Sequence, residues 1–179
     1  MTDAKKDMLD KIKHARLIAD LEYVCSTAGV MEKYLHESML DHCGDVEVDW
    51  VRNYPKYRAE GVPGLLLHGI SNPDTRCQSI AAALLRNYTD ARVIPLNSLI
   101  DMHTKDLDMS PTVLLIPNLY MTTTGRALVA WRQQVAYDIL LERSTKGKPT
   151  VAYVESMEGV KSSYGQPFSD FLTKFIQVK

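Results

Sequence analysis

The chain has 179 residues, enough for one domain, and three features that would each indicate a class of protein are scarce or missing. Its three cysteines are too far apart for a paired zinc-ligand motif, and their odd number argues against a disulfide framework. With a formal net charge of −1, the chain has no overall basic excess for nucleic acid. No apolar run approaches the ~20 residues of a membrane span, and residues 1–10 are polar and charged. We therefore predict a cytoplasmic protein without a structural metal.

From residue 64 onward, short apolar runs alternate with segments of helical periodicity. Continuous apolar runs are typical of strands that are buried on both faces of a parallel sheet. Alternating strands and helices predict right-handed crossovers and a three-layer α/β sandwich. The predicted strands are 65–67, 93–96, 113–116, 151–154 and 175–178. The predicted helices between them are 76–88, 98–105, 126–144 and 166–173.

An α-helical extension of residues 1–60 is predicted to precede an α/β domain of residues 61–179. Apolar residues recur every three or four positions over residues 3–27, which predicts one amphipathic helix. A shorter helix is predicted over residues 30–40, and residues 46–60 are ambiguous. The apolar stripe of the first helix consists of Met8, Ile12, Ala15, Ile18, Leu21 and Cys25.

The turn after the first predicted strand begins like a phosphate-binding loop and then departs from the motif. Such a loop reads G-x-x-x-x-G-K-[ST], and its backbone N–H groups, lysine and hydroxyl hold the phosphates and Mg²⁺. Gly69 starts the loop here and Asn72 lies within it, but Asp74, Thr75 and Arg76 replace the second glycine, the lysine and the hydroxyl. Asp74 would repel a triphosphate. A register shift of one residue brings Arg76 to the lysine position without restoring the motif.

A second catalytic feature of P-loop ATPases is an acidic pair at the end of an apolar strand. After the predicted strand 113–116, Pro117 and Asn118 occupy these positions. Proline cannot coordinate a metal, and a neutral asparagine is a poor catalytic base. Two separate losses favour a domain that does not hydrolyse ATP.

On these segments, residues 62–179 resemble the helicase-loader branch of the AAA+ ATPases, the DnaC/IstB-like proteins. The resemblance implies the sheet order 5-1-4-3-2, and the lid of full AAA+ modules is not expected here. It also places an altered phosphate-sensing position near Glu155 and Ser156, and it places Arg143 at the family's arginine pair, where it could touch a neighbouring subunit. The alternative for Arg143 is a charged residue in the last turn of a helix, stabilised by the helix dipole. The matching stretches are GLLLHG at 64–69, SIAAALL at 79–85, VLLIPNLY at 113–120 and LERSTKGKPTVAYV at 141–154.

The resemblance implies an interaction protein that binds a replicative helicase or another AAA+ ATPase in DNA replication. It would act without catalysis, as an adaptor, loader-like factor or inhibitor, and phage or mobile-element biology is implied only by the resemblance. In the loaders an N-terminal helical region grips the helicase. The candidate partner contacts are therefore Met8, Ile12, Ile18 and Leu21. Self-association through the N-terminal helices stays an open alternative.

Two other functions also stay open. The chain could bind a nucleotide without hydrolysis through backbone N–H groups at the start of helix 76–88, with Arg76 in place of lysine. Alternatively, it could contact single-stranded DNA weakly through a cluster of aromatic rings interleaved with cations. The rings are Trp50, Tyr54 and Tyr57, and the cations are Arg52, Lys56 and Arg58. No histidine and cysteine spacing matches a standard metal site, and no catalytic residue or cofactor is expected.

Overall fold

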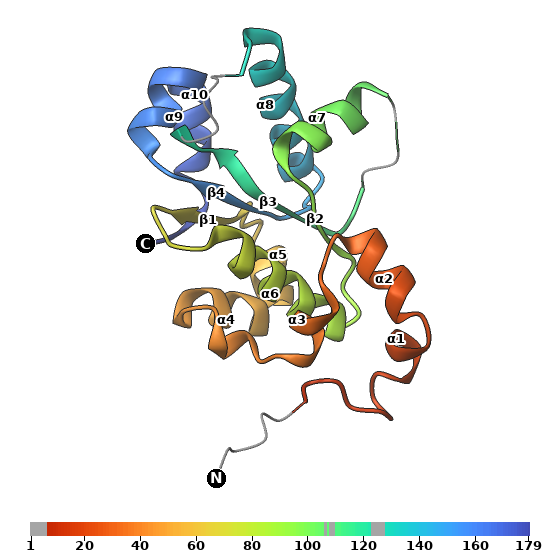
Figure 1. Ribbon diagram of the computed structural model, residues 1–179. Coiled ribbons are helices and arrows are strands. Elements are labelled where there is room, and N and C mark those ends of the chain that lie inside the picture. The colour runs from red at the N-terminus through yellow and green to blue at the C-terminus, as the bar shows by residue number, and fades with distance from the viewer. Residues whose placement is uncertain (1–6, 106, 108–109, 123–127) are drawn as a thin grey trace.

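The computed structural model describes residues 7–105, 107, 110–122 and 128–179, and a parallel sheet lies at its centre (Figure 1). The five strands of this sheet have the order β2-β3-β4-β1-β5, and each neighbouring pair is parallel. The order is the predicted 5-1-4-3-2 read from the other edge, so the fold class is confirmed. The strands are β1 (Gly64–His68), β2 (Ala91–Val93), β3 (Val113–Tyr120), β4 (Thr150–Val154) and β5 (Ile176–Val178).

Helices cover both faces of the sheet and complete a three-layer sandwich (Figure 1). One face is covered by α6 (Pro73–Arg86) and by the N-terminal helices α1 (Ala15–Ala19), α2 (Leu21–Ala28), α3 (Glu32–His36), η1 (Met39–Asp41), α4 (Asp45–Arg52) and α5 (Tyr54–Ala59). The other face is covered by α7 (Leu96–Thr104), α8 (Ala130–Thr145), α9 (Met157–Tyr164) and α10 (Gln166–Leu172).

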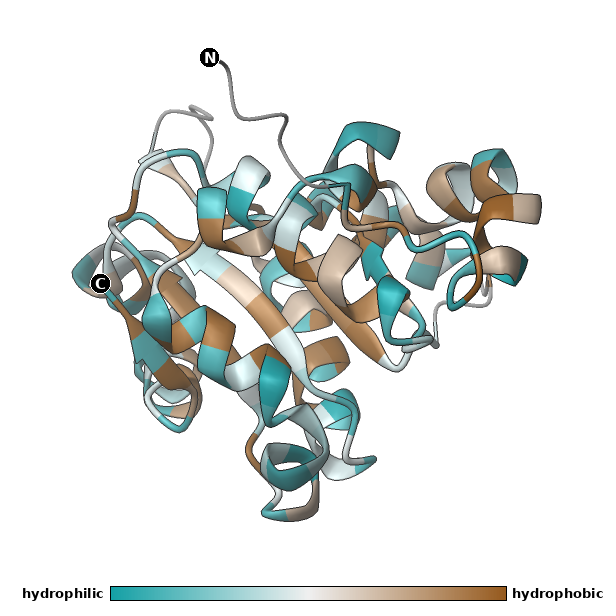
Figure 2. Cartoon of the chain, turned by 90° about the horizontal axis from the view of Figure 1, so that it is seen from below, coloured by the Kyte–Doolittle hydropathy of each residue, from teal (hydrophilic) through white to brown (hydrophobic). Residues whose placement is uncertain are grey.

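The continuous apolar runs follow from this double coverage. Successive residues of a strand point to opposite faces of the sheet. Leu65 and Leu67 accordingly lie in the core beneath α6, whereas Leu66 lies in the core on the other side. All three are fully buried, and each contributes about 1.5–3 kcal/mol by leaving water. Figure 2 shows hydrophobic segments along the central strands and hydrophilic residues concentrated on the outer helices and loops.

The glycine that starts β1 is required by the approach of β4. Gly64 has φ +142°, and a Cβ atom built on it would lie 1.7 Å from the carbonyl oxygen of Thr150. The two residues are register partners in the β1–β4 ladder. Only a residue without a side chain allows the strands to pair at this point.

The single helix predicted over residues 3–27 is wrong for the described part of that range. Two short helices, α1 and α2, meet at Asp20, and residues 7–14 lie outside them. Asp10 explains the irregular start, since its carboxylate accepts hydrogen bonds from the backbone N–H groups of Ile12 and Lys13, and its own N–H donates to Nδ1 of His14. Such side-chain bonds compete with helix formation.

The N-terminal helices are fixed to the α/β part by polar contacts as well as by apolar packing. Arg86 at the end of α6 is buried, and its Nη1 donates to the carbonyl oxygens of Tyr34, Leu35 and Glu37 at 2.9, 3.0 and 3.2 Å. Side chains from both parts share one hydrophobic core. The boundary at residue 60 stays a prediction.

Most elements of the α/β part lie near their predicted positions. The second strand is earlier, at Ala91–Val93 instead of 93–96, and the described part of the helix predicted over 126–144 begins at Ala130. Helix α9 was not predicted. Its first turn is capped by Ser156, whose Oγ accepts from the N–H of Gly159 at 3.1 Å.

Candidate functional site

The turn between β1 and α6 is where a phosphate-binding loop would lie in this fold. Only residues 69–72 separate the strand from the helix. Gly69 and Asn72 have left-handed backbone conformations, with φ +61° and +53°. Pro73 occupies the first helical position, where it provides no N–H group. Asp74, which stands at the second-glycine position of the motif, therefore lies within the first turn of α6 and not in an open loop.

The side chains that follow this turn bind the N-terminal helices. Nη1 of Arg76 donates to Oε1 of Glu47 in α4 at 2.5 Å, and the Glu47 side chain is only 1% exposed. The hydroxyl of Thr75 accepts from the Tyr34 hydroxyl of α3 at 3.3 Å. The cation that could replace the P-loop lysine is thus held by a buried carboxylate. Phosphate would have to compete with that carboxylate.

The segment of β3 that would carry an acidic pair also differs from the P-loop ATPase pattern. The predicted end at residue 116 is wrong, because β3 continues to Tyr120 with an irregular register after Ile116. Pro117 is buried within this strand. Oδ1 of Asn118 accepts from the backbone N–H of Leu96 at 2.8 Å, so this side chain satisfies the first N–H of α7. Asn118 therefore has a structural role, and neither position carries a carboxylate.

The residues after β4 bind the chain's own backbone. Oε2 of Glu155 accepts from the backbone N–H and the hydroxyl of Thr122, at 2.5 and 2.6 Å. These two hydrogen bonds, chiefly the one from the hydroxyl, lower the pKa of Glu155. Ser156 is the cap of α9. Polar groups at the carboxyl ends of β3 and β4 are therefore engaged within the protein.

A cleft of about 940 Å³ lies beside the carboxyl end of β3, between α7, α8 and α9. Arg132 and Asp101 form an ion pair of 2.7 Å in its wall, and Trp131 is half exposed at its rim. The carboxyl edge of a parallel sheet is the usual place for ligands in open α/β folds. No motif in the sequence indicates this cleft, because its residues come from four separate elements.

The proposed nucleic-acid residues do not form a stacking surface. Tyr54 is buried and packs edge-to-face against buried Trp50, with ring centroids 5.4 Å apart. Arg52, Lys56 and Arg58 are exposed on the outside of the same helices. The short helices α4 and α5 place the rings of Trp50 and Tyr54 inward and the cations outward, and only the third ring, Tyr57, is partly exposed.

The proposed partner contacts likewise do not form one helical stripe. Ile12 is 91% exposed, Met8 and Ile18 are just over one-third exposed, and Leu21 is partly buried. Met8 and Ile12 precede α1, Ile18 lies in α1 and Leu21 begins α2. Their role in partner binding stays a prediction.

Arg143 lies in the last turn of α8, as the helix-end alternative has it, and its side chain is buried. Its guanidinium donates to the hydroxyl of Thr150 and to the carbonyl oxygens of Pro111, Thr112 and Pro149, at 3.2–3.4 Å. Burial lowers the pKa of Arg143 to about 10. The alternative in which Arg143 touches a neighbouring subunit is wrong for this conformation, since the side chain is 94% buried by the protein itself.

Within the described ranges, no group of three or more histidine, cysteine or acidic side chains is placed to hold a metal ion. Among the helices of those ranges, none is both long and apolar enough to cross a bilayer.

Comparison with known proteins supports the architecture. No protein-family model matches the chain, and a search of curated proteins found no match. The chain is similar to a solved structure described as a DNA replication initiation factor, with a TM-score of 0.56 and 9% sequence identity. The match covers 83% of this chain and 50% of the other, so the chain spans about half the length of that protein. At this identity the likeness establishes the P-loop-like three-layer fold.

Proposed function

We propose that this chain is a non-catalytic AAA+-like interaction protein of DNA replication, which binds a replicative helicase or another AAA+ ATPase. One observation carries the proposal. The fold resembles that of a DNA replication initiation factor, while the residues at the phosphate-binding and acidic positions of this chain, Arg76 and Asn118, are bound to other residues of the same chain. The fold would then act through its surface.

The contacts of Arg76 and Asn118 support the absence of catalysis. ATP hydrolysis needs a cation on the phosphates and a group that orients the attacking water. Glu47 holds Arg76, and Asn118 is committed to the start of α7. The alternative of nucleotide binding through Arg76 lacks a free cation in this arrangement. The alternative of DNA stacking lacks an exposed Tyr54 ring.

Affinity purification of the full chain from its native cells tests the proposal. We expect a replicative helicase or another AAA+ ATPase to be recovered, and the purified pair to form a complex in size-exclusion chromatography. The complex should also form when ATP is omitted from the buffer, because binding does not use nucleotide held at the loop of this chain. Two results would contradict the proposal. One is the recovery of no ATPase in repeated purifications, and the other is a complex that forms only after this chain has bound ATP.

A further inference from the structure

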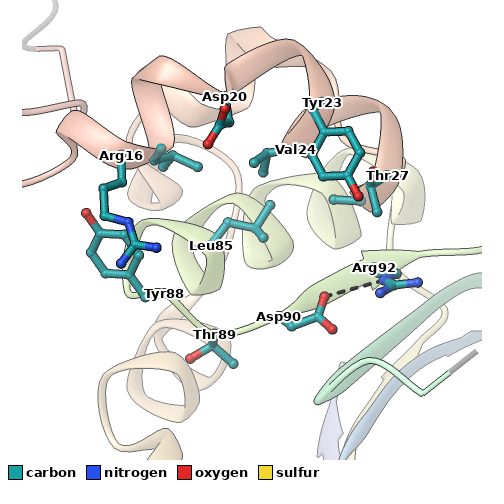
Figure 3. A pocket seen from close by; sticks show the side chains of 12 residues that line it. Arg16, Asp20, Tyr23, Val24, Thr27, Leu85, Tyr88, Thr89, Asp90 and Arg92 are labelled. Carbon is teal, nitrogen blue, oxygen red and sulfur yellow. Dashed lines mark hydrogen bonds and ion pairs between the residues drawn. The ribbon is translucent and has the colours of Figure 1, made fainter.

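A groove separate from the nucleotide-loop position lies between the N-terminal helices and the amino end of β2 (Figure 3). Its volume is about 440 Å³, within the range of sites that bind ligands or anchor side chains. Its base is apolar, formed by Leu17, Val24, Ala28 and Leu85. Its rim is polar and carries Arg16, Asp20, Tyr23, Tyr88, Asp90 and Arg92.

Two tyrosines stand at the rim with much of their surface in water. Tyr23 is 71% exposed and Tyr88 is 57% exposed. Tyrosine and arginine are enriched among the residues that dominate protein interfaces, because they combine a large contact area with a polar group. Exposed tyrosines around an apolar base therefore favour a protein ligand.

Tyr88 is held in a conformation that is unusual for its residue type. It has φ +57°, a left-handed value that bulky side chains rarely adopt. The backbone N–H of Tyr88 donates to Leu85 at 2.9 Å, and its hydroxyl donates to the carbonyl oxygen of Lys13 at 2.6 Å. The first bond holds the backbone of Tyr88, and the second holds the outer end of its side chain beside the groove. A fixed side chain loses less entropy when a ligand packs against it.

The charges of the groove indicate what kind of protein segment fits. Asp90 and Arg92 form a pair at 3.4 Å on one wall. On the other wall Arg16 and Asp20 both extend toward the groove (Figure 3), and neither forms an ion pair within the described part of the chain. Two cations and two anions give no net field for nucleic acid or an anionic membrane. They complement a segment that carries one charge of each sign.

We propose that this groove docks a segment of a partner protein in which an apolar anchor is flanked by one acidic and one basic residue. The anchor packs on Leu17, Val24 and Leu85 between the two tyrosines. The acidic residue pairs with Arg16 and the basic residue with Asp20. The inference rests on the proposed function as an interaction protein and names the surface that the function uses.

Selection of a displayed random 12-residue peptide library on the full chain tests the groove without a known partner. We expect enriched peptides to share an apolar anchor with an acid and a base within four positions of it. Tyr23→Ala and Arg16→Glu should each weaken a selected peptide about tenfold or more in calorimetry. The matched exposed controls Leu40→Ala and Arg52→Glu should bind as the wild type does. All four side chains are exposed, so circular dichroism should confirm that every variant is folded.

Several results would overturn the proposal. One is that the library enriches no peptide. Another is that the selected peptides bind Tyr23→Ala, Arg16→Glu and the control variants with equal affinity. A dimer in light scattering that Tyr23→Ala dissociates would assign the groove to a second copy of the chain. The proposed function is judged separately, by the ATPase recovered from cells. If that complex forms equally well with both groove variants, the groove is wrong and the function stands. If peptides bind the groove but no ATPase is recovered, the groove proposal stands and the proposed function is wrong.

Discussion

Removing either partner of the ion pair between Glu47 and Arg76 should destabilise the protein, and the two losses should differ in magnitude. The Glu47 side chain is 1% exposed, whereas the Arg76 side chain is 23% exposed. Arg76→Met would leave a carboxylate buried without its counterion, which costs about 3–5 kcal/mol in comparable sites. Glu47→Gln would leave a guanidinium that can still reach water, so we expect a smaller loss of about 1–2 kcal/mol.

Urea unfolding followed by circular dichroism measures these changes in the free energy of unfolding. The double variant Glu47→Gln/Arg76→Met should be more stable than the sum of the two single changes predicts, by about 1–3 kcal/mol. In a chain of this length, each kcal/mol corresponds to about 2–4 °C in the unfolding temperature. The matched control is the exposed pair of Glu142 and Lys146 on α8, where Lys146→Met should change stability by less than about 0.5 kcal/mol.

An interaction energy near zero between the Glu47 and Arg76 substitutions would refute the reasoning. So would a larger loss for Glu47→Gln than for Arg76→Met, because the burial of the two side chains sets the order. An interaction energy near zero would mean that Arg76 is available at the loop.

Three further predictions concern packing and burial. Gly64→Ala should prevent folding or cost more than about 3 kcal/mol in urea unfolding, whereas Gly147→Ala, with nothing near its Cβ, should cost about 1 kcal/mol. Arg86→Met should cost about 2–4 kcal/mol in the same assay, since three carbonyl oxygens lose their donor. Burial raises the pKa of the Cys43 thiol from 9.0 to about 12, so at pH 8 Ellman's reagent should label Cys25 before Cys43. Because the unfolded thiol loses its proton first, stability should fall from pH 9 toward pH 12, and Cys43→Ala should reduce that slope.

The sheet could be predicted because its signal is local and physical. A strand such as β1 is buried on both faces, so every side chain from Leu65 to Leu67 must be apolar. The strand order came from the family resemblance, since periodicity does not show which strands are neighbours. The extent of β3 was missed because proline at residue 117 normally ends a strand, and here the irregular register accommodates it.

The break at Asp20 could not be predicted from apolar spacing, which continues through α1 and α2 with little change. Local side-chain bonds at Asp10 and the packing of α2 against β2 decide where the helices lie. The sequence does not distinguish these bonds from solvated polar residues.

The loss of the phosphate ligands was readable from the sequence, but the contacts of the residues in their place were not. Glu47 lies 29 positions before Arg76 in a stretch of ordinary helical charges. Nothing local indicates that its carboxylate is buried. The inward orientation of Tyr54 was hidden for the same reason, because it depends on how α5 packs against the core.

Calorimetric titration of the full chain with Mg·ATP, with phosphate release measured on the same sample, tests whether this chain has lost the nucleotide site of its fold. The account predicts no saturable heat up to about 1 mM nucleotide, the limit of weak binding, and no phosphate above the protein-free control. Glu47→Gln should behave in the same way, because Pro73 and Asn118 remain in place. Saturable micromolar binding, or phosphate released in proportion to the protein, would contradict the account.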